Sequence, residues 1–323
     1  MGTKESTKTS DIDLVIVGSI ALDTIITPFN KMNDLLGGSL SYACIAASSL
    51  QRCGMVGIVG SDFPKKYVEL YRNMGIDISG LHIAEGKTFR WTGEYSADMN
   101  ERRTISTELN VFASFSPEIP PAYRNARFVL LCNISPELQL RVLSQINKPE
   151  FVVADTMDLW IRTEPEPLKK VITSVDMLTI NESEARLLTG KYDIRKYTQV
   201  LHNMGIKWLI IKKGEHGAVL SVDNHFFFVP AYPVQQTMDP TGAGDTFAGA
   251  LIGWLANTQN IELKNVHFAL LYATAMASFC VEDFGLNKLI ELRSDRQNNS
   301  KIIERVKQIA CSMAIPHDKK ASV

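Results

Sequence analysis

The chain has 323 residues, of which 45% are hydrophobic and 21% are charged, and its formal net charge is −1. This length allows one large domain or two ordinary ones, and the composition is that of a globular protein with a sizeable core. The sequence has no block of basic residues, so its charge does not favour a nucleic-acid partner. It also has no apolar run of the roughly 18 residues that a membrane span requires. The five cysteines show neither a disulfide pattern nor metal-ligand spacing, so we expect a cytoplasmic protein without a membrane partner.

Apolar, β-branched runs alternate with segments of helical character along most of the chain. Strands are predicted at residues 13–18, 55–59, 128–132, 151–155, 177–180 and 208–212, and then as a hairpin at 217–222 and 225–230. Helices are predicted at residues 39–53, 63–74, 137–146, 165–171, 182–188 and 194–204, with three more that begin at Gly244, Val266 and Lys301. Because strands that alternate with helices pair in parallel, we predict an α/β fold, a three-layer sandwich with a mostly parallel central sheet.

Two segments break this alternation. Residues 23–27 follow the first strand without a helix, and residues 83–115 alternate apolar and polar side chains without a helical period. Both predict extra antiparallel strands, which would form a small sheet, or lid, over a cleft of the α/β core. No linker divides the chain, and the predicted boundaries are one domain at 12–314, lid strands from about 23–36 and 83–115, and flexible tails at 1–11 and 315–323.

Residues 239–249, Asp-Pro-Thr-Gly-Ala-Gly-Asp-Thr-Phe-Ala-Gly, are the most informative stretch of the sequence. They place a glycine-rich turn at the start of a helix, where unpaired N–H groups and the helix dipole attract anions. Gly242 and Gly244 let the backbone approach a ligand closely, and Asp245 puts a carboxylate beside the anion site. A carboxylate suits this position if it takes the proton of a hydroxyl that attacks a phosphoryl group, whereas a shorter Gly-x-Gly-Asp would indicate only a capped turn.

Two motifs of the N-terminal part fit a site for a hydroxylated ligand. Asp23 follows the first predicted strand, at the edge where open α/β sheets bind ligands, and its carboxylate can accept hydrogen bonds from two neighbouring hydroxyls. Gly37 and Gly38 open the helix predicted from residue 39, so the backbone there can lie close to a ligand. Each motif, taken alone, also fits an ordinary turn or helix start.

Two motifs of the C-terminal half fit phosphate binding. Asn181-Glu-Ser-Glu184 follows a predicted strand, and Mg²⁺ prefers carboxylate and water ligands, although these four residues also fit a helix start with an acidic first turn. Gly214 and Gly217 lie in a loop between two predicted strands. The sequence contains neither a Gly-x-x-x-x-Gly-Lys-[Ser/Thr] string nor a Gly-x-Gly-x-x-Gly after the first strand, which argues against a P-loop enzyme and a Rossmann dehydrogenase.

Together these motifs resemble the ribokinase-like (PfkB) carbohydrate and nucleoside kinases over roughly residues 12–314, and the 239–249 string is the most specific part. The resemblance implies an ATP-dependent kinase that moves the γ-phosphoryl group to a hydroxyl, preferably a primary one, of a small sugar or nucleoside. It also implies ATP and Mg²⁺ as cofactors, K⁺ as a further cation, and a monomer or a homodimer through the lid. Two alternatives stay open: a kinase of an inositol-type polyol, and a non-catalytic family member that binds a sugar or nucleoside.

The resemblance assigns roles to residues position by position. It makes Asp245 the catalytic base and the backbone N–H groups of Gly242, Ala243 and Gly244 the anion hole. The residues implied to bind the acceptor are Asp23, Gly37, Gly38, Tyr42 and Asn133. Those implied to bind the nucleotide are Asn181, Lys212, Gly214, Gly217 and Thr241, with Glu184 holding Mg²⁺ through water and Asp239 near a monovalent cation. Tyr42 stands where many members have Asn, and Lys212 where Thr is usual, so the motifs do not specify the acceptor.

Overall fold

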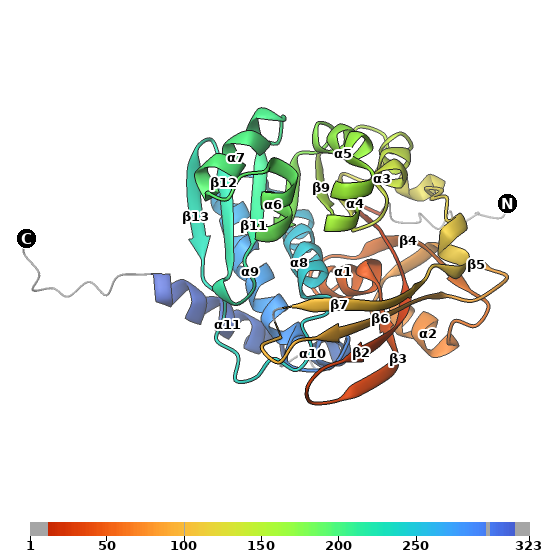
Figure 1. Cartoon of the computed structure of the whole chain (residues 1–323). Coiled ribbons are helices and arrows are strands. Elements are labelled where there is room, and N and C mark those ends of the chain that lie inside the picture. Colours follow the sequence, from red (N-terminus) through yellow and green to blue (C-terminus); the bar gives the residue numbers. More distant parts are fainter. Residues whose placement is uncertain (1–11, 100, 295–297, 314–323) are drawn as a thin grey trace, which may run out of the picture.

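The computed structural model describes residues 12–99, 101–294 and 298–313, which form two β-sheets with helices around the larger one (Figure 1). The larger sheet has nine strands, and every pairing from β11 to β5 is parallel, so the predicted mostly parallel sheet is confirmed. In spatial order its strands are β13 (His225–Val229), β12 (Ala218–Val222), β11 (Trp208–Lys212), β10 (Met177–Asn181), β9 (Phe151–Asp155), β8 (Phe128–Leu131), β1 (Leu14–Val17), β4 (Cys53–Gly60) and β5 (Asp77–Ala84).

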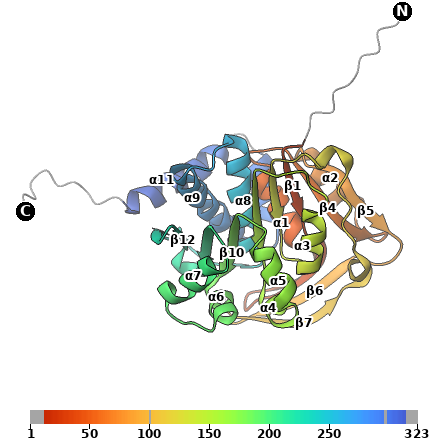
Figure 2. The same cartoon turned by 90° about the horizontal axis from the view of Figure 1, so that it is seen from above.

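Helices cover both faces of this sheet and give the three layers that the sequence predicts (Figure 2). One side carries α1 (Ser39–Ala47), α2 (Lys65–Asn73), α8 (Ala243–Thr258), α9 (Leu263–Cys280), α10 (Asn287–Ser294) and α11 (Asn298–Met313). The other side carries α3 (Pro136–Leu143), α4 (Asp158–Thr163), α5 (Pro165–Ile172), α6 (Glu182–Thr189) and α7 (Ile194–Asn203). A hydrophobic core lies on each side of the sheet. In β1, the side chains of Leu14 and Ile16 pack into the core under the helices named first, and those of Val15 and Val17 pack into the core on the other side, as expected for a strand buried on both faces.

The smaller sheet is the lid. Its four strands, in the order β3, β2, β6 and β7, are β3 (Lys31–Gly37), β2 (Ala21–Ile26), β6 (Phe89–Tyr95) and β7 (Arg102–Glu108). The β2–β3 and β6–β7 pairs are antiparallel as predicted, but the β2–β6 pair is parallel. The reason is that α1, β4, α2 and β5 intervene between these two strands, and such a long crossover can return the chain in the same direction.

Several local predictions were wrong. The sequence did not predict β5, α4 or α10, and the predicted lid segment 83–115 begins inside β5 and ends beyond a 3₁₀ turn at Asn110–Ser114. β5 lies at the edge of the large sheet and is only partly buried, so it lacks the apolar run that marks the central strands.

Helix α1 also ends at Ala47, whereas the sequence predicted an end at residue 53. The hydroxyls of Ser48 and Ser49 donate to the carbonyl groups of Ile45 and Ala46 at 2.9 and 2.7 Å. These bonds satisfy carbonyls at the helix end, and the chain turns there into β4. Among the described helices, none combines the length and the apolar character needed to cross a membrane.

Candidate active site

The N-terminus of α8 is the centre of the candidate site. Gly242, the residue before the helix, has φ 75°, and a side chain there would collide with the buried ring of Tyr42. Within the described residues, the N–H groups of Gly242 and Gly244 have no backbone acceptor. The N–H of Ala243, which the sequence also placed in the anion hole, already donates to the Pro240 carbonyl at 3.3 Å, and the Thr246 N–H donates to the Gly242 carbonyl at 2.8 Å. The turn therefore presents free donors at the positive end of a helix, as an anion site requires. Tyr42 lies behind this turn and supports it from the core.

Asp245 lies in the first turn of α8 and is half-buried. Burial raises the pKa of its carboxyl to about 7, and the negative charge of Asp155 acts in the same direction. The charges of Lys212 and Arg102 oppose this rise. A carboxylate that titrates near neutral pH beside an anion site is suited to general-base catalysis.

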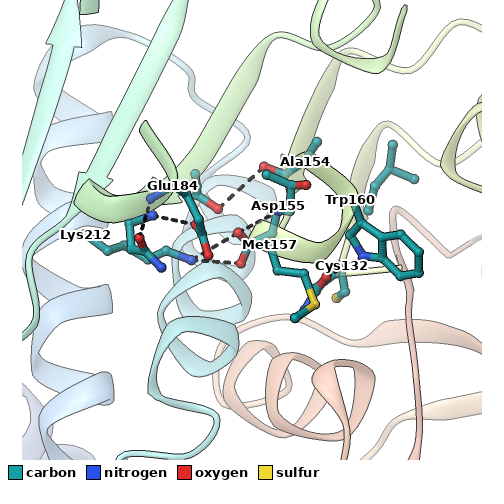
Figure 3. A network of polar contacts seen from close by, with 12 residues as sticks. Cys132, Ala154, Asp155, Met157, Trp160, Glu184 and Lys212 are labelled. Atoms are coloured by element: carbon teal, nitrogen blue, oxygen red, sulfur yellow. Dashed lines mark hydrogen bonds and ion pairs between the residues drawn. The ribbon is translucent and has the colours of Figure 1, made fainter. Parts of the chain in front are cut away.

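A buried ion pair lies beside this helix start (Figure 3). Lys212, at the end of β11, places its Nζ 2.8 and 3.1 Å from the two carboxylate oxygens of Asp155, at the end of β9. The same Nζ lies 3.2 Å from the point where a Cβ on Gly244 would be. Sequence analysis missed Asp155, although its position at the carboxyl end of a predicted buried strand was a usable signal.

Asn181 and Glu184 form a reciprocal cap at the start of α6. The Asn181 side chain accepts the Glu184 N–H at 2.8 Å, and the Glu184 carboxylate accepts the Asn181 N–H at 2.8 Å through its Oε2. Burial raises the pKa of the Glu184 carboxyl to about 7, although the charge of Lys212 opposes this rise. The helix-start interpretation is thus correct, and the cap also holds the Glu184 carboxylate next to the Lys212–Asp155 pair (Figure 3).

Asp23 lies on the inner side of the lid, on β2, and is only 4% exposed. Its Oδ1 is buried without a hydrogen-bond partner, and its Oδ2 fills the space that a side chain on Gly37 would occupy. Burial raises the pKa of the Asp23 carboxyl to about 8, and the negative charges of Asp239 and Asp245 raise it as well. A hydrogen bond from the Gly38 backbone lowers this pKa. The structure therefore brings Asp23 into electrostatic range of the Asp245 carboxylate, as an acceptor-binding residue requires.

Asn133 follows β8 and is held by two residues that the sequence did not indicate. Its Oδ1 accepts the indole N–H of Trp160 at 2.9 Å, and its Nδ2 lies 3.2 Å from the Met157 sulfur. Trp160 belongs to α4, a helix that sequence analysis missed, so no local pattern could have identified this contact. The orientation of the Asn133 amide is fixed by these neighbours.

Asp239 is buried behind the turn that precedes α8. Its carboxylate accepts the backbone N–H groups of Thr241 at 2.8 Å and Gly285 at 2.9 Å, so these three residues meet. The Thr241 hydroxyl hydrogen-bonds the hydroxyl of Tyr95, from lid strand β6, at 2.9 Å. This contact, missed by sequence analysis, connects the lid to the start of the α8 turn.

Gly214 and Gly217 flank a 3₁₀ turn between β11 and β12. Both have positive φ, 55° and 88°, but their surroundings differ. A side chain on Gly217 would collide with the Val229 carbonyl, whereas the space beside Gly214 is open. Gly217 thus fixes the loop against β13, and Gly214 leaves its outer side free for a ligand.

We expect Gly217→Ala to destabilise the protein by about 2 to 4 kcal/mol, because it combines a strained φ with overpacking. Gly190→Ala is the matched control: Gly190 also has positive φ, 65°, but nothing lies within 4 Å of its added Cβ. Strain alone should cost that variant about 1 kcal/mol. Urea unfolding of both variants measures the difference, and equal losses would contradict the proposed close contact at Gly217.

Comparisons with known proteins identify relatives of this chain. The family model described as pfkB family carbohydrate kinase matches residues 13–292. A cytidine kinase of Thermococcus kodakarensis is 31% identical over 259 residues, which cover 78% of this chain and 91% of that protein.

Two solved structures share the fold. The ribokinase of Arabidopsis thaliana, complexed with ribose and ATP, matches with a TM-score of 0.71 and 23% identity over 92% of this chain and 99% of that one. The fructokinase of Vibrio cholerae O395, bound to fructose, ADP and calcium, matches with a TM-score of 0.73 and 19% identity over 86% and 96% of the two chains. From its sequence match and its fold, the chain belongs to the pfkB family of carbohydrate kinases.

Proposed function

We propose that this protein transfers the γ-phosphoryl group of ATP to a hydroxyl, preferably a primary one, of a nucleoside or a sugar. The observation that carries the proposal is the position of Asp245. Its half-buried carboxyl, with a pKa raised to about 7 by burial, lies in the first turn of α8, next to the free N–H groups of Gly242 and Gly244. A base and an anion site in one helical turn are what an attacking hydroxyl and a phosphoryl group need.

In the proposed reaction Asp245 accepts the proton of the acceptor hydroxyl as its oxygen attacks the γ-phosphorus. The bond between that phosphorus and the bridging oxygen of ADP breaks, and ADP leaves with the electron pair. The N–H groups of Gly242 and Gly244 stabilise the negative charge that develops on the phosphoryl oxygens, and the N–H of Ala243 would join them by leaving the Pro240 carbonyl. Closure of the lid, including the Tyr95–Thr241 contact, would keep water from the phosphoryl group.

The nucleotide side of the site would be formed by Asn181, Lys212, Gly214, Gly217 and Thr241. When bound, Mg²⁺ would neutralise part of the negative charge on the phosphates of ATP. Glu184 fits a role in holding it through water, because the Asn181 N–H occupies only Oε2 and Oε1 is left to accept a further hydrogen bond. Asp239 would lie near a monovalent cation, although both its oxygens already accept backbone N–H groups.

The acceptor side would be formed by Asp23, Gly38 and Asn133. Because the unpaired Asp23 Oδ1 is buried within the lid, hydroxyl donors of an acceptor would remove an unfavourable buried group. The identity to a cytidine kinase favours a nucleoside over a simple sugar as the acceptor.

The function is tested by measuring ADP release with ATP, Mg²⁺ and K⁺ and a panel of acceptors: ribose, fructose, adenosine, cytidine, inosine, myo-inositol and 2-keto-3-deoxygluconate. We expect turnover with at least one nucleoside and weaker turnover with the free sugars. Thermal stabilisation by an acceptor without any ADP release would instead support a non-catalytic binding protein. Turnover with myo-inositol alone would assign the protein to polyol phosphorylation.

A further inference from the structure

The Lys212–Asp155 pair carries a role that binding of the nucleotide does not explain. Lys212 is the last residue of β11, and its ammonium lies beside the start of α8, 3.2 Å from the position of a Cβ on Gly244. It is 17% exposed and Asp155 is 5% exposed, so a charged pair has been buried beside the anion turn (Figure 3). Burial of a charged pair is costly unless the geometry compensates it, and it is poor evidence of a purely stabilising role.

We propose that Lys212 is a catalytic residue that contacts the transferring phosphoryl group, and that Asp155 is a positioning residue that holds its ammonium at the N-terminus of α8. This inference rests on the proposed kinase function. An ammonium has three N–H donors, and Asp155 accepts from it at two oxygens, so a donor is left for a phosphoryl oxygen. The Nζ lies 3.2 Å from the position of a Cβ on Gly244, and the Gly244 N–H is itself free. The Lys212 ammonium and the Gly244 N–H are therefore both donors at the anion site at the start of α8.

Asp155 also solves a problem that a lysine beside a catalytic carboxylate creates. A free ammonium at this place would pair with Asp245 and make it a weaker base. The contact of Nζ with both Asp155 oxygens holds the lysine away from such a pair. The effects on Asp245 agree with this arrangement, because Asp155 raises the pKa of that carboxyl and Lys212 lowers it.

The next residue, Lys213, shows that the placement of Lys212 is specific. Its Nζ lies 2.5 Å from Glu182, on α6, away from Asp155. Lys213 therefore gives a matched control, a neighbouring lysine that also forms an ion pair but does not face the anion turn.

In the step proposed here no bond to lysine forms. The phosphoryl group moves from the ADP oxygen to the acceptor oxygen, the hydroxyl proton goes to Asp245, and Lys212 only donates a hydrogen bond to a phosphoryl oxygen. Because charge on these oxygens is greatest in the transition state, the contact should affect kcat more than the KM for ATP.

The test compares Lys212→Met, Asp155→Asn, the double variant and Lys213→Met with the wild-type protein. We expect Lys212→Met to lower kcat by about 100-fold and Asp155→Asn by about 10-fold to 100-fold, with KM for ATP within about threefold of wild type. Lys213→Met should keep kcat within about twofold of the wild-type value, because Lys213, unlike Lys212, makes no contact with the transition state in this proposal.

The double variant separates chemistry from folding. Lys212→Met alone leaves Asp155 buried without its partner and should lower Tm, whereas the double variant removes both charges and should recover most of that Tm. Its kcat should stay as low as that of Lys212→Met.

Recovery of kcat together with Tm, or a Lys212→Met variant that changes only KM for ATP, would overturn the catalytic role. If the wild-type protein shows no turnover with any acceptor, the proposed function fails and this inference with it. Wild-type turnover with an unaffected Lys212→Met variant would overturn this inference alone.

Discussion

Asp245→Asn is expected to lower kcat by about 10³-fold, within the range that loss of a general base produces. Asn has the same shape as the carboxylate, so the turn at the start of α8 should keep its structure. ATP binding should change little, because the free N–H groups of Gly242 and Gly244 belong to the backbone. Kinetics with a saturating acceptor, together with a thermal-shift measurement of ATP binding, would test both statements.

The pH dependence of kcat/KM gives a second view of the same residue. In the ligand-free protein Asp245 has a raised pKa of about 7, so it is protonated below that pH and cannot accept the hydroxyl proton. The wild-type kcat/KM should therefore fall on the acid side of pH 7, by about tenfold per unit, and the residual activity of Asp245→Asn should lack this limb.

Asp193→Asn serves as a control for this experiment, because Asp193 is an exposed carboxylate that caps a different helix, α7. Its kcat and pH profile should match those of the wild-type protein. An Asp245→Asn variant that retains wild-type turnover, or loses it only through KM for ATP, would rule out the base.

The features that could be predicted from the sequence are those set by neighbours along the chain. Gly242 to Asp245 lie in one turn, and the run of glycines before an apolar helix is a local signal of an anion site. Asn181 and Glu184 are three residues apart, which is the spacing of the cap that the structure shows. The alternation of buried strands with helices similarly gave the layered fold.

The features that could not be predicted depend on contacts between distant segments. Lys212 and Asp155 are 57 residues apart, and Tyr95 and Thr241 are 146 residues apart. Each of these residues alone fits an ordinary strand end or turn, so only the sheet order makes it part of the site. The parallel β2–β6 pair has the same cause, since an alternating pattern predicts a strand but not its partner or direction.

Asp23→Asn is expected to lower kcat/KM for the acceptor by about 100-fold or more. Once it has lost its proton, the Asp23 carboxylate can accept hydrogen bonds from two hydroxyls of the acceptor, and each charge-assisted bond contributes about 1.5 to 3 kcal/mol. An amide keeps the size that fits against Gly37 but offers one acceptor oxygen and no charge. KM for ATP should stay near its wild-type value, and a loss confined to ATP would contradict the placement of Asp23 on the acceptor side.

The same substitution should stabilise the protein in the absence of ligands at pH 8. The Asp23 carboxyl has a pKa of about 8 in the folded state and 3.8 as its reference value, so between these pH values the folded protein keeps a proton that the unfolded chain has lost. The wild-type free energy of unfolding therefore falls as the pH rises through this window, and Asn, which does not titrate, removes that contribution. We expect Asp23→Asn and the wild type to be similar near pH 4.5, and the variant to be more stable by a few kcal/mol at pH 8. Urea unfolding at both pH values measures this difference.

Equal pH dependence in the two proteins would mean that Asp23 is already ionised in the closed lid. A gain in stability with a loss of acceptor use would show that the buried carboxyl is kept for binding, at the expense of stability.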